Sequence, residues 1–258
     1  MAKNPVAKNE YEKEFIRIFN ELCYSRSSWQ VWDDFVAVTA IALSNAFEGN
    51  EKVKADRECE YAKCIERLGG ERKPASMFAL LTEAMTENPE QDFLGNMFMN
   101  LNLGNHWVGQ FFTPYHLCEM MAEINIDGLR ERIDNQGWVS VFDCACGAGA
   151  TLIAAANVMK NHGVNYQDHA LFVAQDISRT AALMCYIQLS LLGCAGYVVV
   201  GNTITNPITG KSVLLPTEKD SQDFWYTPMF SSNVWRYRRT FNMMDLLFES
   251  GKKDQKDG

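Results

Sequence analysis

Two carboxylate-bearing strand ends and a glycine-containing turn have the residue types of a ligand-binding loop. Asp143 follows the apolar run Val139–Phe142, and the small-residue turn after it contains Gly147 and Gly149. Glycine permits backbone angles that a Cβ forbids, and it lets a ligand approach the main chain. The D-x-x-x-G-x-G spacing is not the G-x-G-x-x-G of phosphate-binding loops, and a carboxylate here repels phosphate. The loop favours a cationic or hydroxyl-rich ligand; the alternative is an ordinary strand–helix turn.

Polar residues also end the next two expected strands, because Asp176 follows the second and Asn202 the third. Strands that alternate with helices imply right-handed crossovers and a parallel sheet, whose ligands lie beyond the carboxyl ends of the strands. We therefore expect Asp143, Asp176 and Asn202 to share one edge of the sheet, although each could instead serve as a cap or turn residue. The expected strands are Val139–Phe142, Ala170–Gln175 and Tyr197–Val200, and the helices between them are Ala150–His162 and Ser178–Leu192.

The first ~100 residues have helical periodicity throughout. The pattern predicts an N-terminal helical bundle over residues 1–100, followed by a second domain over residues 101–258. The aromatic residues Phe15, Phe19, Trp32, Phe35 and Phe47 are assigned to its core. The expected helices are Glu10–Cys23, one from Ser27 or Ser28 to Phe47, Glu51–Leu68, Pro74–Thr86 and Gln91–Asn100. The fold class that follows is α/β, with an incomplete, parallel-rich sheet in the second domain.

The segments on either side of the expected sheet are less regular. Thr113 is expected to cap a helix with Pro114 at its first position, running over Tyr115–Ile124. A polar connector is expected over Asp127–Gly137. The segment Ser221–Arg239 mixes aromatic residues with arginines. Such a mixture can stack on single-stranded nucleic acid, but a protein contact surface or a packed C-terminal helix is the favoured interpretation.

Composition excludes several classes of protein. The chain of 258 residues is 47% hydrophobic and 22% charged, which is typical of a globular protein. Its net charge of −8 argues against strong non-specific nucleic-acid binding by this chain alone. No apolar run has the length of a membrane span, and the start lacks a secretory pattern. We therefore expect a cytoplasmic protein whose eight cysteines are reduced, with no membrane association and no metal site.

Four segments resemble, in order, motifs of the N6-adenine DNA methyltransferases, especially the modification subunits of type I restriction systems. The first two together are specific, whereas the last two are weak alone. The resemblance covers roughly residues 92–203. The segments are Gly109-Gln110-Phe111-Phe112-Thr113-Pro114 (family G-Q-F-[FY]-T-P), Asp143-Cys144-Ala145-Cys146-Gly147-Ala148-Gly149 (D-P-x-C-G-x-G), Ala174-Gln175-Asp176 (G-Q-[ED]) and Gly201-Asn202-Thr203 (G-D-[TS]).

The resemblance implies a Rossmann-like methyltransferase domain that binds S-adenosylmethionine and transfers its methyl group directly to an adenine amino nitrogen in DNA. A partner subunit would supply sequence recognition. Asp143 suits the cationic end of the cofactor, Asp176 the ribose hydroxyls, and Asn202 the adenine ring. The implied cofactor-binding residues are Phe111, Phe112, Thr113, Pro114, Asp143, Cys144, Ala145, Gly147, Gly149, Asp176, Ile177 and Asn202.

The chain departs from the family at three points. Cys144 replaces a proline, and Asn202 replaces an aspartate. The family's catalytic [DNS]-P-P-[YFW] tetrapeptide has no clear match, since Asn206-Pro207-Ile208-Thr209 has one proline and no aromatic residue. Residues 138–258 are also fewer than the roughly 170 that a seven-stranded sheet with its helices needs.

These departures leave three hypotheses. The first is an N6-adenine DNA methyltransferase, or its cofactor-binding portion, that acts in a complex. The second is a catalytically inactive module that keeps the fold for binding or regulation. The third is a different methyltransferase or nucleotide binder on the same scaffold, which the G-Q-F-F-T-P stretch disfavours.

Overall fold

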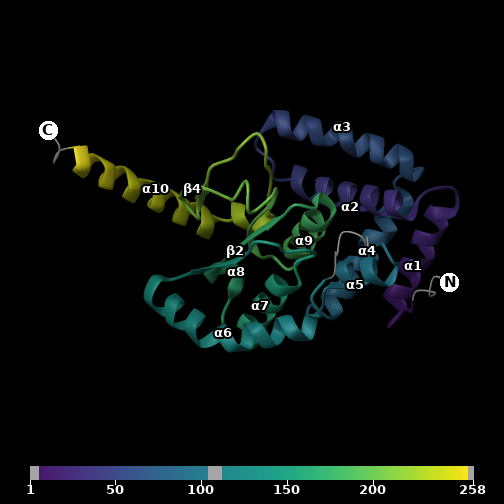
Figure 1. Ribbon diagram of the computed structural model, residues 1–258, viewed down its shortest axis with the longest axis horizontal. Coiled ribbons are helices and arrows are strands. Elements are labelled where there is room, and N and C mark those ends of the chain that lie inside the picture. Colours follow the sequence, from purple (N-terminus) through teal and green to yellow (C-terminus); the bar gives the residue numbers. More distant parts are fainter. Residues whose placement is uncertain (1–5, 104–111, 255–258) are drawn as a thin grey trace.

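The computed structural model describes residues 6–103 and 112–254, and it has the expected α/β character (Figure 1). A group of helices lies at one end, a mixed sheet lies in the middle, and the C-terminal helix extends from the other end (Figure 1). Phe111 lies outside the described residues, so its expected role stays a prediction.

Between residues 6 and 100 the structure has five helices and a short 3-10 turn, close to the expected bounds. Asn9 starts the first helix, because its side-chain oxygen accepts a hydrogen bond from the Glu12 amide at 2.8 Å. Gly69 ends the third helix with a φ of 79°. The elements are α1 (Glu10–Leu22), η1 (Cys23–Ser25), α2 (Ser28–Asn45), α3 (Glu51–Leu68), α4 (Arg72–Glu87) and α5 (Phe93–Asn100).

The aromatic residues of these helices form an edge-to-face cluster. The Phe15 ring centroid lies 5.5 Å from that of Phe35 and 5.5 Å from that of Phe93. Phe47, in contrast, is 56% exposed, so its assignment to the core was wrong. It lies just after the end of α2, in the connection to α3. One continuous hydrophobic core joins these helices to those that flank the sheet, and α2 packs directly on α9.

The sheet has the strand order β1-β2-β3-β6. The first three strands are parallel, as expected, whereas β6 is antiparallel to β3. The main crossover helices are α7, between β1 and β2, and α9, between β2 and β3. The sheet and its connections are β1 (Val139–Asp143), α7 (Ala150–Asn161), α8 (Tyr166–His169), β2 (Ala170–Asp176), α9 (Arg179–Leu191), β3 (Ala195–Val200) and β6 (Asp223–Tyr226).

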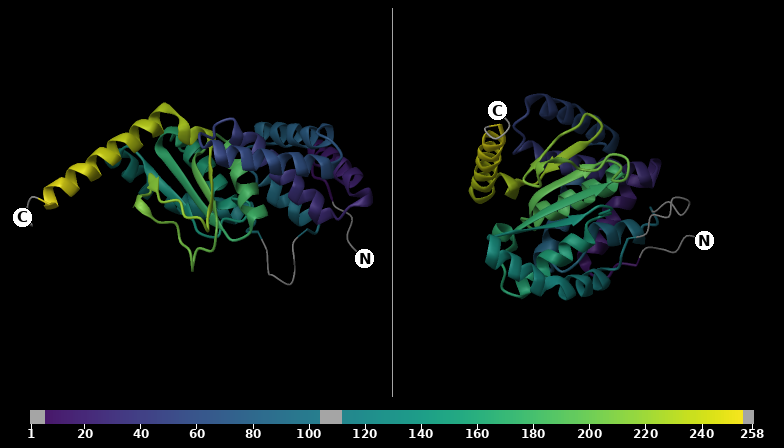
Figure 2. Two further views of the ribbon diagram at one scale, coloured as in Figure 1. Left: turned by 90° about the horizontal axis from the view of Figure 1, so that it is seen from above. Right: turned by 60° about the vertical axis from the view of Figure 1, so that its left-hand side comes forward.

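Helices cover one face of the sheet, and a smaller apolar cluster covers part of the other. Phe172 and Val198 pack into the main core with α7 and α9. On the opposite face, Val173 and Tyr197 belong to a cluster that includes Leu214 and Trp235. The hairpin segment and the start of the C-terminal helix lie on this side of the sheet (Figure 2). That second cover consists of the two-stranded hairpin β4 (Gly210–Ser212) and β5 (Leu215–Pro216), the 3-10 turn η2 (Pro228–Ser231) and the start of α10 (Asn233–Asp254).

The helix before the sheet differs from the expected helix and connector. It is one continuous helix, α6 (Tyr115–Gln136), and it runs through the segment that was expected to be a polar connector. Ile126 is buried and Ile133 is half-buried, which holds the second half of the helix in place. Pro114 takes the N-cap position that was expected for Thr113, and this helix start has no side-chain capping hydrogen bond. The helix packs along α7 and touches β1.

No helix in the described ranges combines the length and hydropathy that crossing a membrane requires. Among the same residues, no three His, Cys, Asp or Glu side chains are grouped as metal ligands would be. All eight cysteines are free. The division into domains at residue 100 stays a prediction.

Candidate cofactor-binding site

Asp143 holds the turn that follows β1. One carboxylate oxygen accepts a hydrogen bond from the Ala145 amide at 3.0 Å, and the other accepts from the Thr151 hydroxyl. Thr151 lies in the first turn of α7. The carboxylate therefore bridges the strand end and the start of the helix, and it stays half-buried.

Asp176 fastens the same turn from the neighbouring strand. Its two oxygens accept main-chain hydrogen bonds from Gly147 at 2.9 Å and from Ser178 at 2.8 Å. Burial raises the pKa of the Asp176 carboxyl and the Asp143 charge adds to the rise, while the two N–H groups oppose it. Each Asp176 oxygen keeps one free lone pair. Ribose hydroxyls could therefore donate at most one hydrogen bond to each oxygen.

The two glycines of the turn are required by its geometry. Gly147 has a φ of +53°, and a Cβ on it would lie 2.9 Å from the Phe112 ring. Gly149 has a φ of +96°, and a Cβ on it would lie 2.8 Å from the Cys185 sulfur. The structure thus brings Phe112 against the D-C-A-C-G-A-G turn, although the two are about thirty residues apart.

The segment after β3 also reaches this turn. The Thr203 hydroxyl donates to the Cys144 carbonyl at 2.6 Å, and the Gly201 amide donates to the Asp176 carbonyl at 2.9 Å. The Asn202 side-chain oxygen accepts from the Ile204 and Thr205 amides at 2.9 and 3.1 Å. The Asn202 side chain therefore stabilises a turn. This is the turn-residue role that the sequence analysis gave as the alternative to ligand binding.

The remaining expected residues lie at the surface around this turn. Thr113, Pro114, Cys144, Ala145 and Ile177 are all exposed, and Ile177 is 70% exposed directly after Asp176. An exposed isoleucine beside a half-buried carboxylate offers an apolar surface next to a hydrogen-bond acceptor. This arrangement gives a site with two carboxylates, no facing lysine or arginine among the contacts described above, and an apolar rim.

Sequence reasoning missed a buried hydrogen-bond network beneath the turn. The Gln188 side-chain amide donates to the Ala148 carbonyl at 2.9 Å and to the Asp92 carboxylate at 2.8 Å, and its oxygen accepts from the Leu94 amide at 3.1 Å. Burial raises the pKa of Asp92, with the bonds from Gln188 and Gly95 opposing the rise. No local pattern could reveal it, because Asp92 and Gln188 are 96 residues apart in sequence.

A second missed feature is the tetrapeptide Thr227-Pro228-Met229-Phe230, which follows β6. It has one proline and the aromatic residue of the family's catalytic motif. The Thr227 amide donates to the carbonyl of Gly196, near the start of β3. Since Asp176 lies beside the other end of β3, opposite Val200, the tetrapeptide and the aspartates occupy opposite ends of the sheet.

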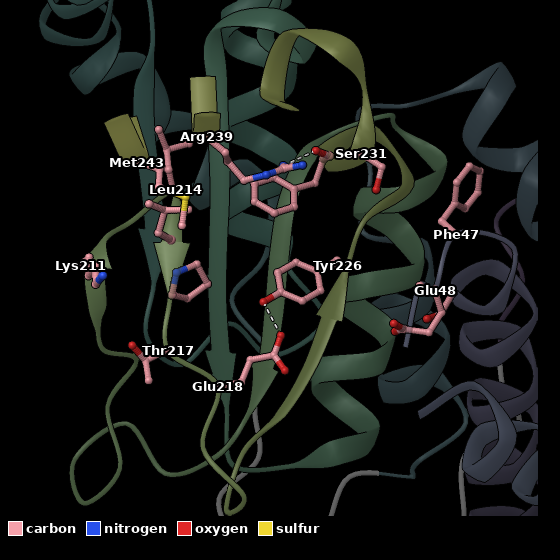
Figure 3. A pocket seen from close by; sticks show the side chains of 15 residues that line it. Phe47, Glu48, Lys211, Leu214, Thr217, Glu218, Tyr226, Ser231, Arg239 and Met243 are labelled. Atoms are coloured by element: carbon pink, nitrogen blue, oxygen red, sulfur yellow. Dashed lines mark hydrogen bonds between the residues drawn. The ribbon is translucent and has the colours of Figure 1, made fainter. Parts of the chain in front are cut away.

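The tetrapeptide borders a cavity of about 530 Å³ that lies between the hairpin segment, the α2–α3 connection and α10 (Figure 3). Tyr226 donates to Glu218 at 2.8 Å on its wall, and Arg239 lies 4.1 Å above the Phe230 ring. None of the residues that line this cavity belongs to the turn after β1. It is therefore separate from the candidate cofactor site.

Comparison with known proteins gives two findings. The sequence profile of the family described as N-6 DNA Methylase matches residues 92–254. The methylase subunit of the type I restriction enzyme MpnII from Mycoplasma pneumoniae (strain ATCC 29342 / M129 / Subtype 1) is 30% identical over 83 residues. That match covers 32% of this chain and 14% of the length of the relative.

Proposed function

This chain belongs to the N-6 DNA methylase family, and from that premise we propose that it binds S-adenosylmethionine as the cofactor-binding part of an adenine-specific DNA methyltransferase. Members of this family generally use this cofactor. The site would lie beyond the carboxyl ends of β1 and β2. A DNA substrate and a partner subunit that recognises the sequence are part of the proposal, as the name of the type I relative suggests.

The observation that carries the proposal is the pairing of Asp143 and Asp176 around one turn. Two carboxylates held close together repel each other, and a cationic ligand relieves that repulsion. A sulfonium and an ammonium group supply such charge, whereas a phosphate would be repelled. The residues therefore fit S-adenosylmethionine better than they fit a nucleoside phosphate.

The side chains would divide the work of binding. Asp143 would face the cationic methionine end, and Phe112 would wall it. Asp176 would accept from the ribose with its remaining lone pairs, and Ile177 would support the adenine. When bound, the cofactor would supply an activated methyl group; the residues of this chain would hold it in one orientation, which is how positioning contributes to catalysis.

Calorimetric titration of S-adenosylmethionine into the purified chain tests the proposal. We expect micromolar binding by the wild type and loss of binding in Asp143→Ala, because the variant removes the charge that attracts the cation. Asp134→Ala, an exposed aspartate on α6, is the matched control and should bind normally. Absence of wild-type binding, or equal affinity in Asp143→Ala, would contradict the proposal.

A second candidate function is a methyltransferase-like module without catalytic activity. The position of Thr227-Pro228-Met229-Phe230 at the far end of the sheet favours it, because these residues are remote from the proposed methyl donor. Transfer of labelled methyl groups to unmodified DNA by the purified chain, lost in Asp143→Ala, would exclude this candidate.

A further inference from the structure

The C-terminal helix α10 packs on the body of the chain along one side. Trp235 is fully buried. The Ser212 hydroxyl donates to the Asn242 side chain, and the Arg239 guanidinium donates to the Phe230 carbonyl. Trp235, Arg239 and Asn242 follow one another by four and three positions, so they lie along one side of the helix. The later part of α10 extends away from the sheet (Figures 1 and 2).

The other side of α10 carries an apolar stripe that stays exposed. Its members follow one another by three, four, three and four positions, which is the a/d repeat of a coiled-coil seam. Each member is at least 36% exposed, and Phe248 is 71% exposed. A helix that packs only on its own domain turns its apolar side inward, so this exposed seam indicates a helical partner. The members of the seam are Val234, Tyr237, Phe241, Met244 and Phe248.

Two charged residues border the seam on one edge. Arg238 and Asp245 occupy the e position of successive repeats. The Arg238 guanidinium donates to main-chain carbonyls, to that of Gly137 at 3.0 Å and to that of Asp168. Among the side chains that the structure describes, neither Arg238 nor Asp245 has an opposite charge at salt-bridge distance. Both charges are therefore available to a partner.

These two charges distinguish the two ways in which α10 could pair with a copy of itself. In a parallel pair each e position faces a g position of the partner, and the g positions within the seam are the uncharged Thr240 and Leu247. In an antiparallel pair e faces e, so Arg238 of each copy would lie beside Asp245 of the other. The antiparallel pair therefore gains two salt bridges across the seam, and the parallel pair gains none.

The apolar side chains of the seam match in the same antiparallel register. Phe241 of one copy would lie opposite Met244 of the other, and Tyr237 would lie opposite Phe248. Each aromatic ring then faces an apolar partner, and every contact occurs twice by symmetry. The surface of α10 is therefore complementary to itself in shape and in charge.

We propose that α10 joins two copies of this chain as a short antiparallel coiled coil, held by the exposed seam and by reciprocal Arg238–Asp245 salt bridges. The seam from Val234 to Phe248 spans about 21 Å, given a rise of about 1.5 Å per residue. The same patch of each copy meets the other, so the pair closes as a twofold dimer and does not extend into a fibre. This inference goes beyond the proposed function and does not depend on it.

Sedimentation equilibrium of the purified full chain tests the association. A seam of about two heptads pairs weakly, so we expect the average mass to rise from that of one chain toward that of two between about 1 µM and about 500 µM. Phe241→Glu places a carboxylate at the centre of the seam and should weaken the dimer by about tenfold or more. Ile124→Glu, at a residue of α6 that is 74% exposed, is the matched control and should dimerise normally.

Both substitutions change exposed side chains, so circular dichroism should show the wild-type helix content in each variant. A wild-type chain that stays monomeric over the whole concentration range would overturn the proposal. Equal association of the wild type and Phe241→Glu would overturn it as well.

Charge reversal tests the edge of the seam. Asp245→Arg would bring like charges together twice in the dimer, so we expect association to weaken by about tenfold or more. Asp134→Arg makes the same change of net charge at an exposed position of α6 and should leave association unchanged. Equal association in these two variants would contradict the reciprocal salt bridges.

Cysteine cross-linking tests the orientation of the two helices. Tyr237→Cys and Phe248→Cys chains are mixed, oxidised and digested, and mass spectrometry identifies the peptides that a disulfide joins. We expect a disulfide between position 237 of one copy and position 248 of the other. Disulfides that join 237 to 237 or 248 to 248 in its place would show a parallel pair and overturn the proposal, as would the absence of any cross-link between these positions.

Discussion

The main-chain amide of Gly147 donates to the Asp176 carboxylate at 2.9 Å, so the turn after β1 is fastened to the end of β2. The contact fixes the turn from two strands at once, since Asp143 bonds it from the other side. The shape of the candidate site therefore depends on the backbone of a glycine as much as on the two carboxylates.

Gly147→Ala should disrupt the site more than it disrupts the fold. The new Cβ would meet the Phe112 ring at 2.9 Å, and the positive φ adds strain of about 1–2 kcal/mol. We expect affinity for S-adenosylmethionine to fall by about tenfold or more, measured by calorimetry. Gly163→Ala is the control, because Gly163 has a φ of +76° with open space around it. The Gly163→Ala variant should have similar backbone strain but unchanged affinity for S-adenosylmethionine. An equal loss of affinity in both variants would contradict the prediction.

Cofactor affinity should fall on acidification in a range above the ordinary aspartate pKa of about 3.9. Burial raises the pKa of Asp176, so its charge is lost at a higher pH than that of an exposed aspartate. The raised pKa means that the folded state favours the protonated form. This group therefore contributes stability as the pH falls and loses that contribution as the pH rises through its folded pKa. Affinity and circular dichroism, followed from neutral pH down to the onset of acid unfolding, should show weakened binding before unfolding. Flat affinity over that whole range would contradict the assignment.

Thiol labelling should locate the cofactor. Cys59 and Cys144 are exposed, whereas Cys146 is buried and its hydrogen bond with Cys185, together with burial, raises its pKa. We expect rapid reaction of Cys59 and Cys144 with an aromatic disulfide reagent and slow reaction of Cys146. Saturating S-adenosylmethionine should lower the labelling rate of Cys144 and leave the labelling rate of Cys59 unchanged. Mass spectrometry of the labelled peptides measures both rates. Equal protection of both would place the cofactor elsewhere.

Gln188→Leu should destabilise the chain although its volume is almost preserved. The substitution leaves the buried Asp92 carboxylate, the Leu94 amide and the Ala148 carbonyl without Gln188 as a partner. A buried group that loses its partner costs about 1–3 kcal/mol, so we expect a total loss of about 2–5 kcal/mol in urea unfolding. Gln136→Leu, on the exposed end of α6, should change stability by less than about 0.5 kcal/mol.

Arg57→Lys should show that geometry as well as charge joins α3 to the sheet. The buried guanidinium donates to Ser44, Glu48, Asp223 and the Phe224 carbonyl, and it lies 3.7 Å above the Trp225 ring. A lysine ammonium group cannot make this set of planar guanidinium hydrogen bonds together with the contact on the Trp225 ring. We expect a loss of about 2–4 kcal/mol in urea unfolding, compared with almost none for the exposed Arg132→Lys.

The sequence was informative where the pattern was local. The strands that end near Asp143, Asp176 and Asn202 are short apolar runs between helical patterns, and they lie where periodicity placed them. The turn at Gly147 and Gly149 was predictable because glycine spacing and a strand-ending aspartate are visible in one stretch of chain.

The sequence was misleading where distant contacts decide the structure. Asp127 and Gly128 look like helix breakers, yet α6 continues through them because Ile126 and Ile133 pack into the core. β6 has only four residues and follows a polar stretch, so its pairing with β3 has no local signal. The network of Gln188 and Asp92 likewise exists only after folding.

The shared core of the N-terminal helices and the sheet has a consequence for how such a chain can change over time. α2 packs on α9, and Arg57 of α3 donates a hydrogen bond to the β6 backbone. Each part therefore has apolar and charged side chains that only the other part covers. Exchange of one part for an unrelated sequence would leave aromatic rings and a guanidinium without neighbours. The two parts are therefore expected to be inherited together, with substitutions on one side matched by substitutions on the other.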